Sequence, residues 1–340
     1  MTSADRTRSI SILGGGSWGT ALARHLAMGG RAVRLWVYEA DLAAAMARER
    51  VNPLFLPGFE LPPQVVPTTS LEEACAAAEV LLIAVPSHFC REVLARARPH
   101  LPGRTEVVVA SKGIENGTLL RVSEIASEIL GPKAHAGIAV LSGPSFAREV
   151  AAGQPTAIVA ASADMDLAGR VQDLLSFANL RVYTSADVAG VELGGALKNV
   201  IAIAAGVTEG LGLGANTLAA LITRGLAEIS RLAVALGGRR ETLAGLSGLG
   251  DLVLTCTGSL SRNRTVGIEI GRGRPLAEIE GSMKMVAEGI RTTSSARDLG
   301  RRAGVDMPIT EKVFQVLFEG KPPEEGIRDL LGRPPRPEED

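Results

Sequence analysis

The stretch Ser9–Ala27, SISILGGGSWGTALARHLA, decides the fold. A short apolar run leads into a glycine-rich turn, and an apolar helical pattern follows at once. Gly14, Gly16 and Gly19 form G-x-G-x-x-G, whose glycines allow a tight turn, the approach of a pyrophosphate and close packing of helix on strand. The strand before the turn and the helix after it favour a dinucleotide-binding turn over a plain connecting turn or a flavin site.

A second apolar segment, residues 32–38, ends just before Glu39. In dinucleotide-binding domains a carboxylate about 20 residues beyond the glycines hydrogen-bonds the adenosine ribose. Tyr38 and Glu39 are therefore expected at the cofactor.

As far as residue 187, apolar segments alternate with helix-length segments, which predicts a Rossmann-like, doubly wound and mostly parallel sheet with helices on both faces. The predicted strands are 9–13, 32–38, 80–86, 106–111, 137–142, 156–161 and 181–185. The predicted helices between them are 20–28, 41–50, 91–97 and 119–130. Residues 51–69 contain five prolines, so an extended loop is expected there.

Beyond residue 187 the strands stop, and long Ala/Leu/Gly-rich segments of helical periodicity predict an all-helical second domain. Its predicted helices are 188–211, 217–236, 262–271, 287–303 and 309–318. The sequence thus divides into a dinucleotide-binding domain (1–187), a helical substrate and catalytic domain (188–332) and a Pro-rich, charged tail (333–340) that is expected to be disordered.

The formal net charge of -1 gives no reason to expect nucleic acid or an anionic membrane as a partner. The N-terminus lacks a signal-peptide pattern and no apolar run approaches about 20 residues, so a cytoplasmic protein without a membrane span is expected. The cysteines, Cys75, Cys90 and Cys256, lack CxxC spacing and are expected to be reduced and buried. The four histidines show no ligand spacing, so no metal is expected.

Polar residues follow several of the predicted strands, at the edge of the sheet where ligands bind in doubly wound folds. Lys112 directly follows an apolar strand, and we expect it to face a cofactor phosphate or an anionic substrate rather than solvent alone. Gly143 and Ser145 follow the next strand. His88 is expected to begin a helix near the nicotinamide, with a general acid as the alternative role.

The helical domain carries a lysine where none is expected. Lys198, followed by Asn199, lies in the apolar run VELGGALKNVIAIAAGVTEG. Burying a charged amine there is costly unless it is paired or its pKa falls, so Lys198 is the expected catalytic residue. A lysine that reaches solvent at the domain boundary is the alternative.

Further on, the segment GLSGLGDLVLTCTGSLSRNRTVG contains Asp251 and Thr255 and then an expected helix start. Ser261 is suited to cap that helix, with Arg262 and Asn263 in its first turn. A hydroxyl, a guanidinium, an amide and free N–H groups together form an anion site suited to phosphate. The alternative is an ordinary capped helix with a solvated arginine.

These motifs together resemble a known family. The resembling segments, in order, are GGGSWGTALA, NPLFLPG, AVPSHFCREVL, ASKGIE, SGPSFA, GALKNVIAIAAG, GLSGLGDLVLTCTGSLSRNRTVG and VAEG. From about residue 10 to 330 the chain resembles NAD(P)-dependent glycerol-3-phosphate dehydrogenases of the bacterial type. The resemblance implies reversible hydride transfer between sn-glycerol 3-phosphate and dihydroxyacetone phosphate, with NAD or NADP as cofactor, for glycerophospholipid synthesis.

The resemblance also implies roles for individual residues. Lys198 matches the catalytic lysine, and Lys112 and Asp251 are assigned to catalysis with it. The positions implied to contact or adjoin the substrate are Lys112, Gly143, Ser145, Lys198, Asn199, Asp251, Thr255, Ser261, Arg262 and Asn263. The positions implied to contact the cofactor, besides the glycines, are Ser17, Trp18, Lys112, Ala147, Arg262, Val286 and Glu288. The sequence around Glu288 gives no independent signal for this role.

The chain departs from the family near the ribose, where a basic residue is usual and this sequence has Tyr38-Glu39. A carboxylate there repels a 2′-phosphate, so we predict that NAD is used at least as well as NADP, although Arg34 and Arg48 are near enough in sequence to bind that phosphate. The other interpretations are a 3-hydroxyacid dehydrogenase or ketopantoate reductase, and a non-catalytic NAD-sensing module. The apolar helices would suit a homodimer interface and core packing equally well.

Overall fold

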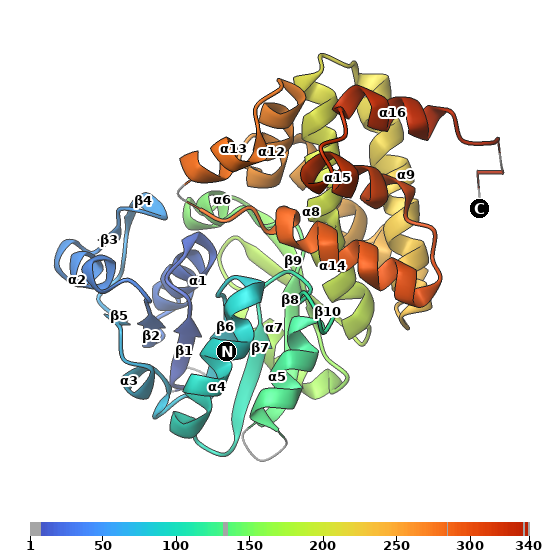
Figure 1. The fold of residues 1–340 in the computed structure, drawn as a ribbon. Helices are drawn as coiled ribbons and strands as arrows, with labels where there is room; N and C mark the ends of the chain where they lie inside the picture. Colours follow the sequence, from blue (N-terminus) through green and yellow to red (C-terminus); the bar gives the residue numbers. More distant parts are fainter. Residues whose placement is uncertain (1–7, 132–134, 284, 336, 339–340) are drawn as a thin grey trace.

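The computed structural model describes residues 8–131, 135–283, 285–335 and 337–338. A sheet-containing N-terminal part and a helical C-terminal part lie side by side (Figure 1). The main sheet consists of β1 (Ile10–Leu13), β2 (Val33–Trp36), β5 (Val65–Thr68), β6 (Val80–Ile83), β7 (Thr105–Val109), β8 (His135–Ser142), β9 (Thr156–Ala161) and β10 (Leu180–Ser185).

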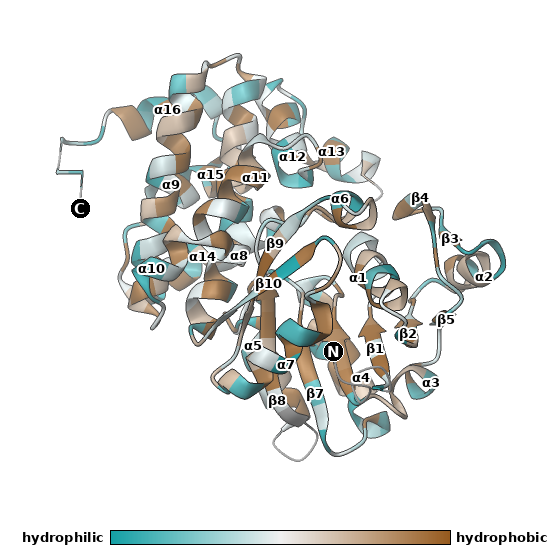
Figure 2. Ribbon diagram, turned by 180° about the vertical axis from the view of Figure 1, so that it is seen from behind, coloured by the Kyte–Doolittle hydropathy of each residue, from teal (hydrophilic) through white to brown (hydrophobic). Residues whose placement is uncertain are grey.

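The strand order in this sheet is β10-β9-β8-β7-β6-β1-β2-β5. Neighbouring strands are parallel except β8 and β9, which pair antiparallel. Because the strands are buried on both faces they read as nearly continuous apolar runs, and most of them are brown in Figure 2. The predicted doubly wound, mostly parallel sheet is therefore confirmed.

Helices cover both faces of the sheet. One face packs against α1 (Ser17–Met28), α2 (Ala40–Glu49) and α7 (Met165–Leu175). The other packs against α3 (Leu71–Cys75), α4 (Cys90–Ala97) and α5 (Val122–Leu130). A short helix, α6 (Ala147–Ala151), follows β8. The three cysteines are buried free thiols, as expected.

Two local expectations for this part of the chain are wrong. Residues 51–69 are not a loop throughout: β3 (Val51–Asn52) pairs with β4 (Leu56–Glu60), and β5 extends the main sheet beyond β2. Pro67 is tolerated in β5 because this strand lies at the sheet edge, where an unpaired side needs no N–H donor. The predicted helix 119–130 begins at Val122, because Leu119 has a positive φ of 62° and belongs to the preceding turn.

The helical part is built around α8 (Val188–Gly210), which packs against several other helices. These are α9 (Ala215–Ala235), α10 (Arg240–Ala244), α11 (Asp251–Thr257), α12 (Arg262–Gly271), α14 (Glu288–Ala303) and α15 (Pro308–Phe318). Two further helices pack on these: α13 (Leu276–Ser282) on α12, and α16 (Pro323–Leu331) on α15. Sequence reasoning did not identify helices α10, α11, α13 and α16. Residues 336, 339 and 340 of the expected tail lie outside the described residues.

Helix α8 is unusually apolar. By length and composition alone it passes the test for a membrane-crossing helix, the one such helix among the described residues. However, 83% of its apolar window is buried inside the protein, which is how a core helix is arranged. We therefore regard its composition as the result of packing on all sides.

Close backbone packing of α8 on α12 positions the second half of the site. A Cβ added to Gly206 would lie 2.0 Å from the Arg264 carbonyl oxygen, and one added to Gly267 would lie 2.0 Å from the Ile203 oxygen. Glycine is therefore needed on both helices for their backbones to touch. This contact brings the N-terminus of α12 beside the middle of α8.

Candidate active site

Two lysines from different domains meet at one carboxylate. Lys198 Nζ of α8 lies 2.7 Å from Asp251 Oδ1, and Lys112 Nζ, beyond the end of β7, lies 2.7 Å from Asp251 Oδ2. Asp251 is 1% exposed and Lys198 is 7% exposed, so little water reaches either charge. The structure thus joins the three residues that the sequence assigns to catalysis.

Local structure explains how Asp251 reaches this place. A π-helical turn, η4 (Leu246–Gly250), ends directly at Asp251, which opens α11. Thr255 stands one turn further along α11, on the same face. Lys198 Nζ donates to Thr255 Oγ1 over 2.7 Å, and that hydroxyl donates to the Asp251 carbonyl oxygen over 2.6 Å. The amine of Lys198 is therefore held by one charged and one neutral acceptor.

Burial and the neighbouring charges shift the pKa values within this cluster. The pKa of Lys198 is lowered to about 8, mainly by burial and to a smaller extent by the charge of Lys112, while Asp251 opposes the shift. Burial by itself would raise the pKa of Asp251, but the two lysines more than offset that effect and hold the pKa below its usual value. At neutral pH the carboxylate is charged, and the Lys198 amine is close to its titration point.

The end of β8 contributes polar backbone to the same place. The Gly143 carbonyl oxygen accepts from Lys112 Nζ over 3.0 Å and from Ser145 Oγ over 3.0 Å. Ser142, 3% exposed, has a side-chain oxygen with no hydrogen-bond partner, and a Cβ on Gly195 of α8 would lie 2.4 Å from it. Sequence reasoning missed Ser142; its position at a strand end, one residue before Gly143, was the available signal.

The residues of the predicted anion site lie at the start of α12. Ser261 Oγ accepts from Arg264 N over 3.2 Å, as the expected cap. Arg262 is exposed, and its guanidinium donates to the Val286 carbonyl oxygen over 2.9 Å. Among the described residues the Arg262 guanidinium has no other hydrogen-bond acceptor and the Ser261 hydroxyl has none, so their other N–H and O–H groups can serve an anion.

Asn263 also serves as a cross-link between helices. Its Nδ2 donates to Asn199 Oδ1 over 2.9 Å, and its Oδ1 accepts from Gly289 N over 2.9 Å. One buried amide thus ties α12 to α8 and α14. Asn199 lies next to Lys198 in sequence, so this cross-link places the anion site close to the lysine cluster.

The glycine-rich turn fits a dinucleotide. A Cβ on Gly14, which has a φ of +122°, would lie 2.7 Å from the Ala84 carbonyl carbon, and one on Gly19 would lie 1.9 Å from the Gly14 oxygen. Gly16 instead faces open space, where a pyrophosphate can approach. In the described part of the chain no side chain caps α1 and no acidic residue lies in its first turn, so its N–H groups are available to phosphate.

Neighbouring segments secure this turn. Asn52 Nδ2 donates to the Gly15 carbonyl oxygen over 2.8 Å and to Thr20 Oγ1 over 2.9 Å. Asn52 is fully buried. Sequence reasoning did not single out Asn52, which lies in a segment that was expected to be an extended loop. Trp18 and Ala147, both expected at the cofactor, pack in one small apolar cluster.

The segment before α14 joins the two domains beside the cofactor turn. Ser17 Oγ donates to Met285 Sδ over 3.3 Å. Glu288 Oε2 accepts from Ser87 Oγ over 2.8 Å, and burial raises the pKa of Glu288. Val286 is 39% exposed, and its carbonyl oxygen contacts Arg262. Tertiary structure therefore gives Glu288 a place next to the strand ends that its sequence setting did not reveal.

Two further expected residues are placed at the sheet edge. His88 lies in the 3-10 turn η2 (Ser87–Phe89) after β6, and burial lowers its pKa. Glu39 directly precedes α2 and is exposed, as is Tyr38. Arg48 lies near the opposite end of α2, paired with Glu49. Since helices rise about 1.5 Å per residue, Arg48 is about 13 Å along the axis from Glu39.

No group of three or more His, Cys, Asp or Glu side chains that could hold a metal occurs among the described residues. A nucleotide-binding turn on a doubly wound sheet, joined to a helical domain that supplies a buried lysine, defines the class of two-domain NAD(P)-dependent dehydrogenases.

Comparison with known families identifies the particular member of this class. Residues 9–168 match the model of the NAD-dependent glycerol-3-phosphate dehydrogenase N-terminus, and residues 187–328 match that of the C-terminus. The chain belongs to the NAD-dependent glycerol-3-phosphate dehydrogenase family.

Individual relatives agree over nearly the whole chain. The glycerol-3-phosphate dehydrogenase [NAD(P)+] of Geobacter metallireducens is 56% identical over 97% of this chain and 98% of its own. That of Geobacter sulfurreducens is 55% identical over 95% and 97%. The crystal structure of glycerol-3-phosphate dehydrogenase from Coxiella burnetii superimposes with a TM-score of 0.92 at 41% identity, over 96% of this chain and 99% of that one.

More distant structures share the fold alone. A ketopantoate reductase from Ralstonia eutropha superimposes with a TM-score of 0.60 at 14% identity, over 94% of this chain and 99% of that one. The interpretation as a ketopantoate reductase or a 3-hydroxyacid dehydrogenase is thus not favoured, and neither is that of a non-catalytic module.

Proposed function

We propose that this protein catalyses the reversible, NAD(P)-dependent reduction of dihydroxyacetone phosphate to sn-glycerol 3-phosphate. The observation that carries the proposal is the buried cluster of Lys198, Asp251 and Lys112, next to an anion site at the start of α12. Family membership supports the same reaction. The product would supply the backbone of glycerophospholipids, and we place the enzyme in the cytoplasm.

Lys198 is the proposed proton donor and acceptor. Its ammonium donates a proton to the substrate oxygen during reduction, and its neutral amine removes the hydroxyl proton during oxidation. A pKa of about 8 suits both directions, because each protonation state is accessible near neutral pH. Thr255 and Asp251 orient the amine, since both accept hydrogen bonds from Lys198 Nζ.

Lys112 and Asp251 have supporting roles in this proposal. Asp251 balances the charges of the buried Lys198 and the partly exposed Lys112, and its ion pair with Lys112 links that residue to the helical domain. Lys112 lies between the strand ends and Asp251, where its charge favours an anionic substrate and lowers the pKa of Lys198. The Gly143 carbonyl group and Ser145 complete the polar wall on this side.

The N-terminus of α12 is the proposed phosphate site. Arg262, the Ser261 hydroxyl and the first N–H groups of the helix provide charge and donors for the substrate phosphate, with Asn263 and Asn199 beside them. A ketone without the phosphate group would lose these contacts.

The proposed cofactor site combines Gly14, Gly16, Ser17, Trp18 and Gly19 with residues of the neighbouring segments. Those residues are Tyr38, Glu39, Lys112, Ala147, Arg262, Val286 and Glu288. A bound nicotinamide dinucleotide supplies or accepts the hydride. The exposed Glu39 carboxylate and the distance of Arg48 support the use of NAD at least as well as NADP.

A spectrophotometric assay tests the proposal. Purified protein with dihydroxyacetone phosphate should oxidise NADH or NADPH, and ketopantoate or a 3-keto acid should give no turnover above background. Turnover with a carboxylate substrate and none with dihydroxyacetone phosphate would contradict the proposal.

A further inference from the structure

Lys112 stands at the start of a tight hairpin, residues 112–121, which we call the Lys112 hairpin. Ile114 and Arg121 form an antiparallel bridge at its base. Within it, Glu115 N donates to the Leu120 oxygen over 2.9 Å. Because Lys112 is only two residues from the base, the position of the base determines where its side chain can reach.

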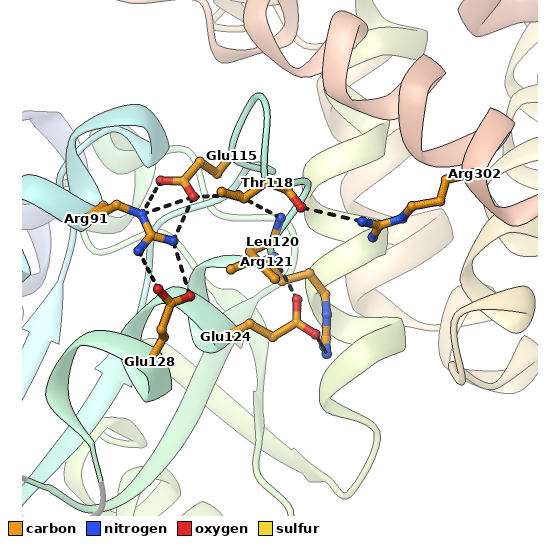
Figure 3. Close-up of polar contacts among 8 residues, drawn as sticks. All are labelled: Arg91, Glu115, Thr118, Leu120, Arg121, Glu124, Glu128 and Arg302. Carbon is orange, nitrogen blue, oxygen red and sulfur yellow. Dashed lines mark hydrogen bonds and ion pairs between the residues drawn. The ribbon is translucent and has the colours of Figure 1, made fainter.

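One arginine of the nucleotide-binding domain binds this hairpin (Figure 3). Arg91 of α4 donates to both carboxylate oxygens of Glu115, over 3.0 Å and 2.9 Å, and to Glu128 of α5 over 2.8 Å. The Thr118 hydroxyl donates to the same Glu115 over 2.5 Å. These contacts fix the outer part of the hairpin to its own domain.

Two residues of the helical domain form hydrogen bonds at the base of the hairpin. Glu192 of α8 accepts from Arg121 Nη1 over 3.2 Å and from Ser123 N over 2.9 Å, and also from the Ser123 hydroxyl. Ser295 of α14 donates to the Ile114 carbonyl oxygen over 3.2 Å. Glu192 is buried, at 7% exposure, so its charge is directed to these partners rather than to water.

One helix therefore contacts the hairpin in two ways. Glu192 and Lys198 lie six residues apart on α8, which is about 9 Å along a rigid helix. Glu192 holds the base of the hairpin, while Lys198 shares the Asp251 carboxylate with the lysine that begins it. We propose that Glu192 is a positioning residue that, through Arg121 and Ser123, fixes Lys112 against Asp251 beside Lys198.

If Glu192 positions Lys112, replacing Glu192 should change the pKa of Lys198. A contact that only stabilises the fold would not have this effect. The charged groups that face Lys198 are Asp251 and Lys112, with the Cys256 thiol nearby. If Lys112 moves away, its repulsion of the Lys198 ammonium falls and the pKa of Lys198 rises. Removing the Glu192 charge without any movement would have the opposite sign, because losing an anion lowers the pKa of a nearby amine.

The test is the titration of Lys198 in the Glu192→Gln variant. The chain has six lysines, so the ¹⁵N and ¹³C signals of labelled lysine side chains are few, and a Lys198→Arg variant assigns the relevant one. We expect the pKa of Lys198 to rise by about half a unit or more. The alkaline limb of the pH profile of kcat should move by the same amount.

Glu228→Gln is the matched control. Glu228 is a buried carboxylate of α9 that accepts from Ile309 N over 2.8 Å and Thr310 N over 2.9 Å, and so caps another helix away from the hairpin. It should lower thermal stability as Glu192→Gln does, yet leave the Lys198 titration unchanged. A Lys198 titration that does not move upward in Glu192→Gln would overturn the proposal.

A second variant keeps the test decisive if Glu192→Gln does not fold. Arg121→Lys preserves the charge but cannot hold Glu192 and Glu124 together as the guanidinium does. The same upward shift is expected, and an unchanged titration would equally overturn the proposal. The inference rests on the proposed function only for its kinetic readout. Absence of turnover in the unmodified protein would refute that function and leave the titration result intact.

Discussion

Lys198 and Lys112 donate to opposite oxygens of the Asp251 carboxylate, each over 2.7 Å, although they belong to different domains. The carboxylate therefore connects the two domains at the place where proton transfer is proposed. Replacing any of the three groups changes the electrostatic environment of the other two. Such a replacement should therefore shift the pKa of Lys198, which a pH profile can detect.

Lys198→Ala should lower kcat by about 10²- to 10⁴-fold, the range expected for loss of a general acid or base. The affinity for NAD or NADP should change little, because the glycine-rich turn lies in the other domain. Steady-state kinetics and cofactor titration check both statements. A variant that keeps most of its turnover would exclude Lys198 as the proton donor.

The two directions of the reaction should depend on pH in opposite ways. Oxidation needs the neutral amine, so its kcat should rise with pH through about 8, the pKa of Lys198. Reduction needs the ammonium, so its kcat should fall above the same pH. Profiles of kcat in both directions, measured when the chemical step limits the rate, provide the check.

Asp251→Asn should shift these profiles toward lower pH. The Asp251 charge opposes the lowering of the Lys198 pKa, so its removal lowers that pKa below about 8. The buried Lys198 would also lose its counterion, at a cost of about 3 to 5 kcal/mol in the free energy of unfolding. An unchanged or more alkaline profile in a folded variant would show that Asp251 does not act on Lys198.

Arg262→Ala should raise KM for dihydroxyacetone phosphate by about tenfold to a hundredfold, since a charged hydrogen bond contributes about 1.5 to 3 kcal/mol. The matched substrate is unphosphorylated dihydroxyacetone, whose kcat/KM should change far less. Equal losses with both substrates would mean that Arg262 acts through the cofactor or the Val286 carbonyl group instead.

Gly267→Ala tests the packing that positions the anion site. The added Cβ would lie 2.0 Å from the Ile203 oxygen of α8, so we expect about 3 kcal/mol or more of destabilisation and a raised KM. Gly169→Ala on α7, where a Cβ meets nothing within 4 Å, is the control and should be neutral or slightly stabilising. Thermal and denaturant unfolding measure the difference.

Much of this site could be predicted from the amino-acid sequence alone. A strand, three spaced glycines and a helix specify a dinucleotide turn because each glycine has a steric reason. The structure has close contacts at Gly14 and Gly19 and open space at Gly16. Lys198 stood out because a lysine in an apolar helix needs a partner. Asp251 was assigned to catalysis with it, but the sequence did not show that the two are paired, because they lie 53 residues apart and only the fold brings them together.

Two local errors, and the contact that the resemblance-based assignment of Glu288 did not specify, have the same origin: local patterns do not encode contacts between distant residues. Glu288 meets Ser87 across 201 residues, and nothing in its local pattern indicates that contact. Leu119 was assigned to a helix from its apolar neighbours, yet the Ile114–Arg121 bridge forces it into a positive φ. The prolines of residues 51–69 excluded a helix, as expected, but β5 forms because an edge strand on β2 was available.

The sequence by itself determined the two domains' classes and the chemical types at the site, because periodicity, glycine spacing and a lysine in an apolar run are local properties of the chain. Only the tertiary structure decided which charges neutralise one another: Lys112, Lys198 and Asp251 come from three separate elements. Their mutual distances set the pKa of Lys198, and such distances depend on how helices and strands pack, which no local pattern encodes.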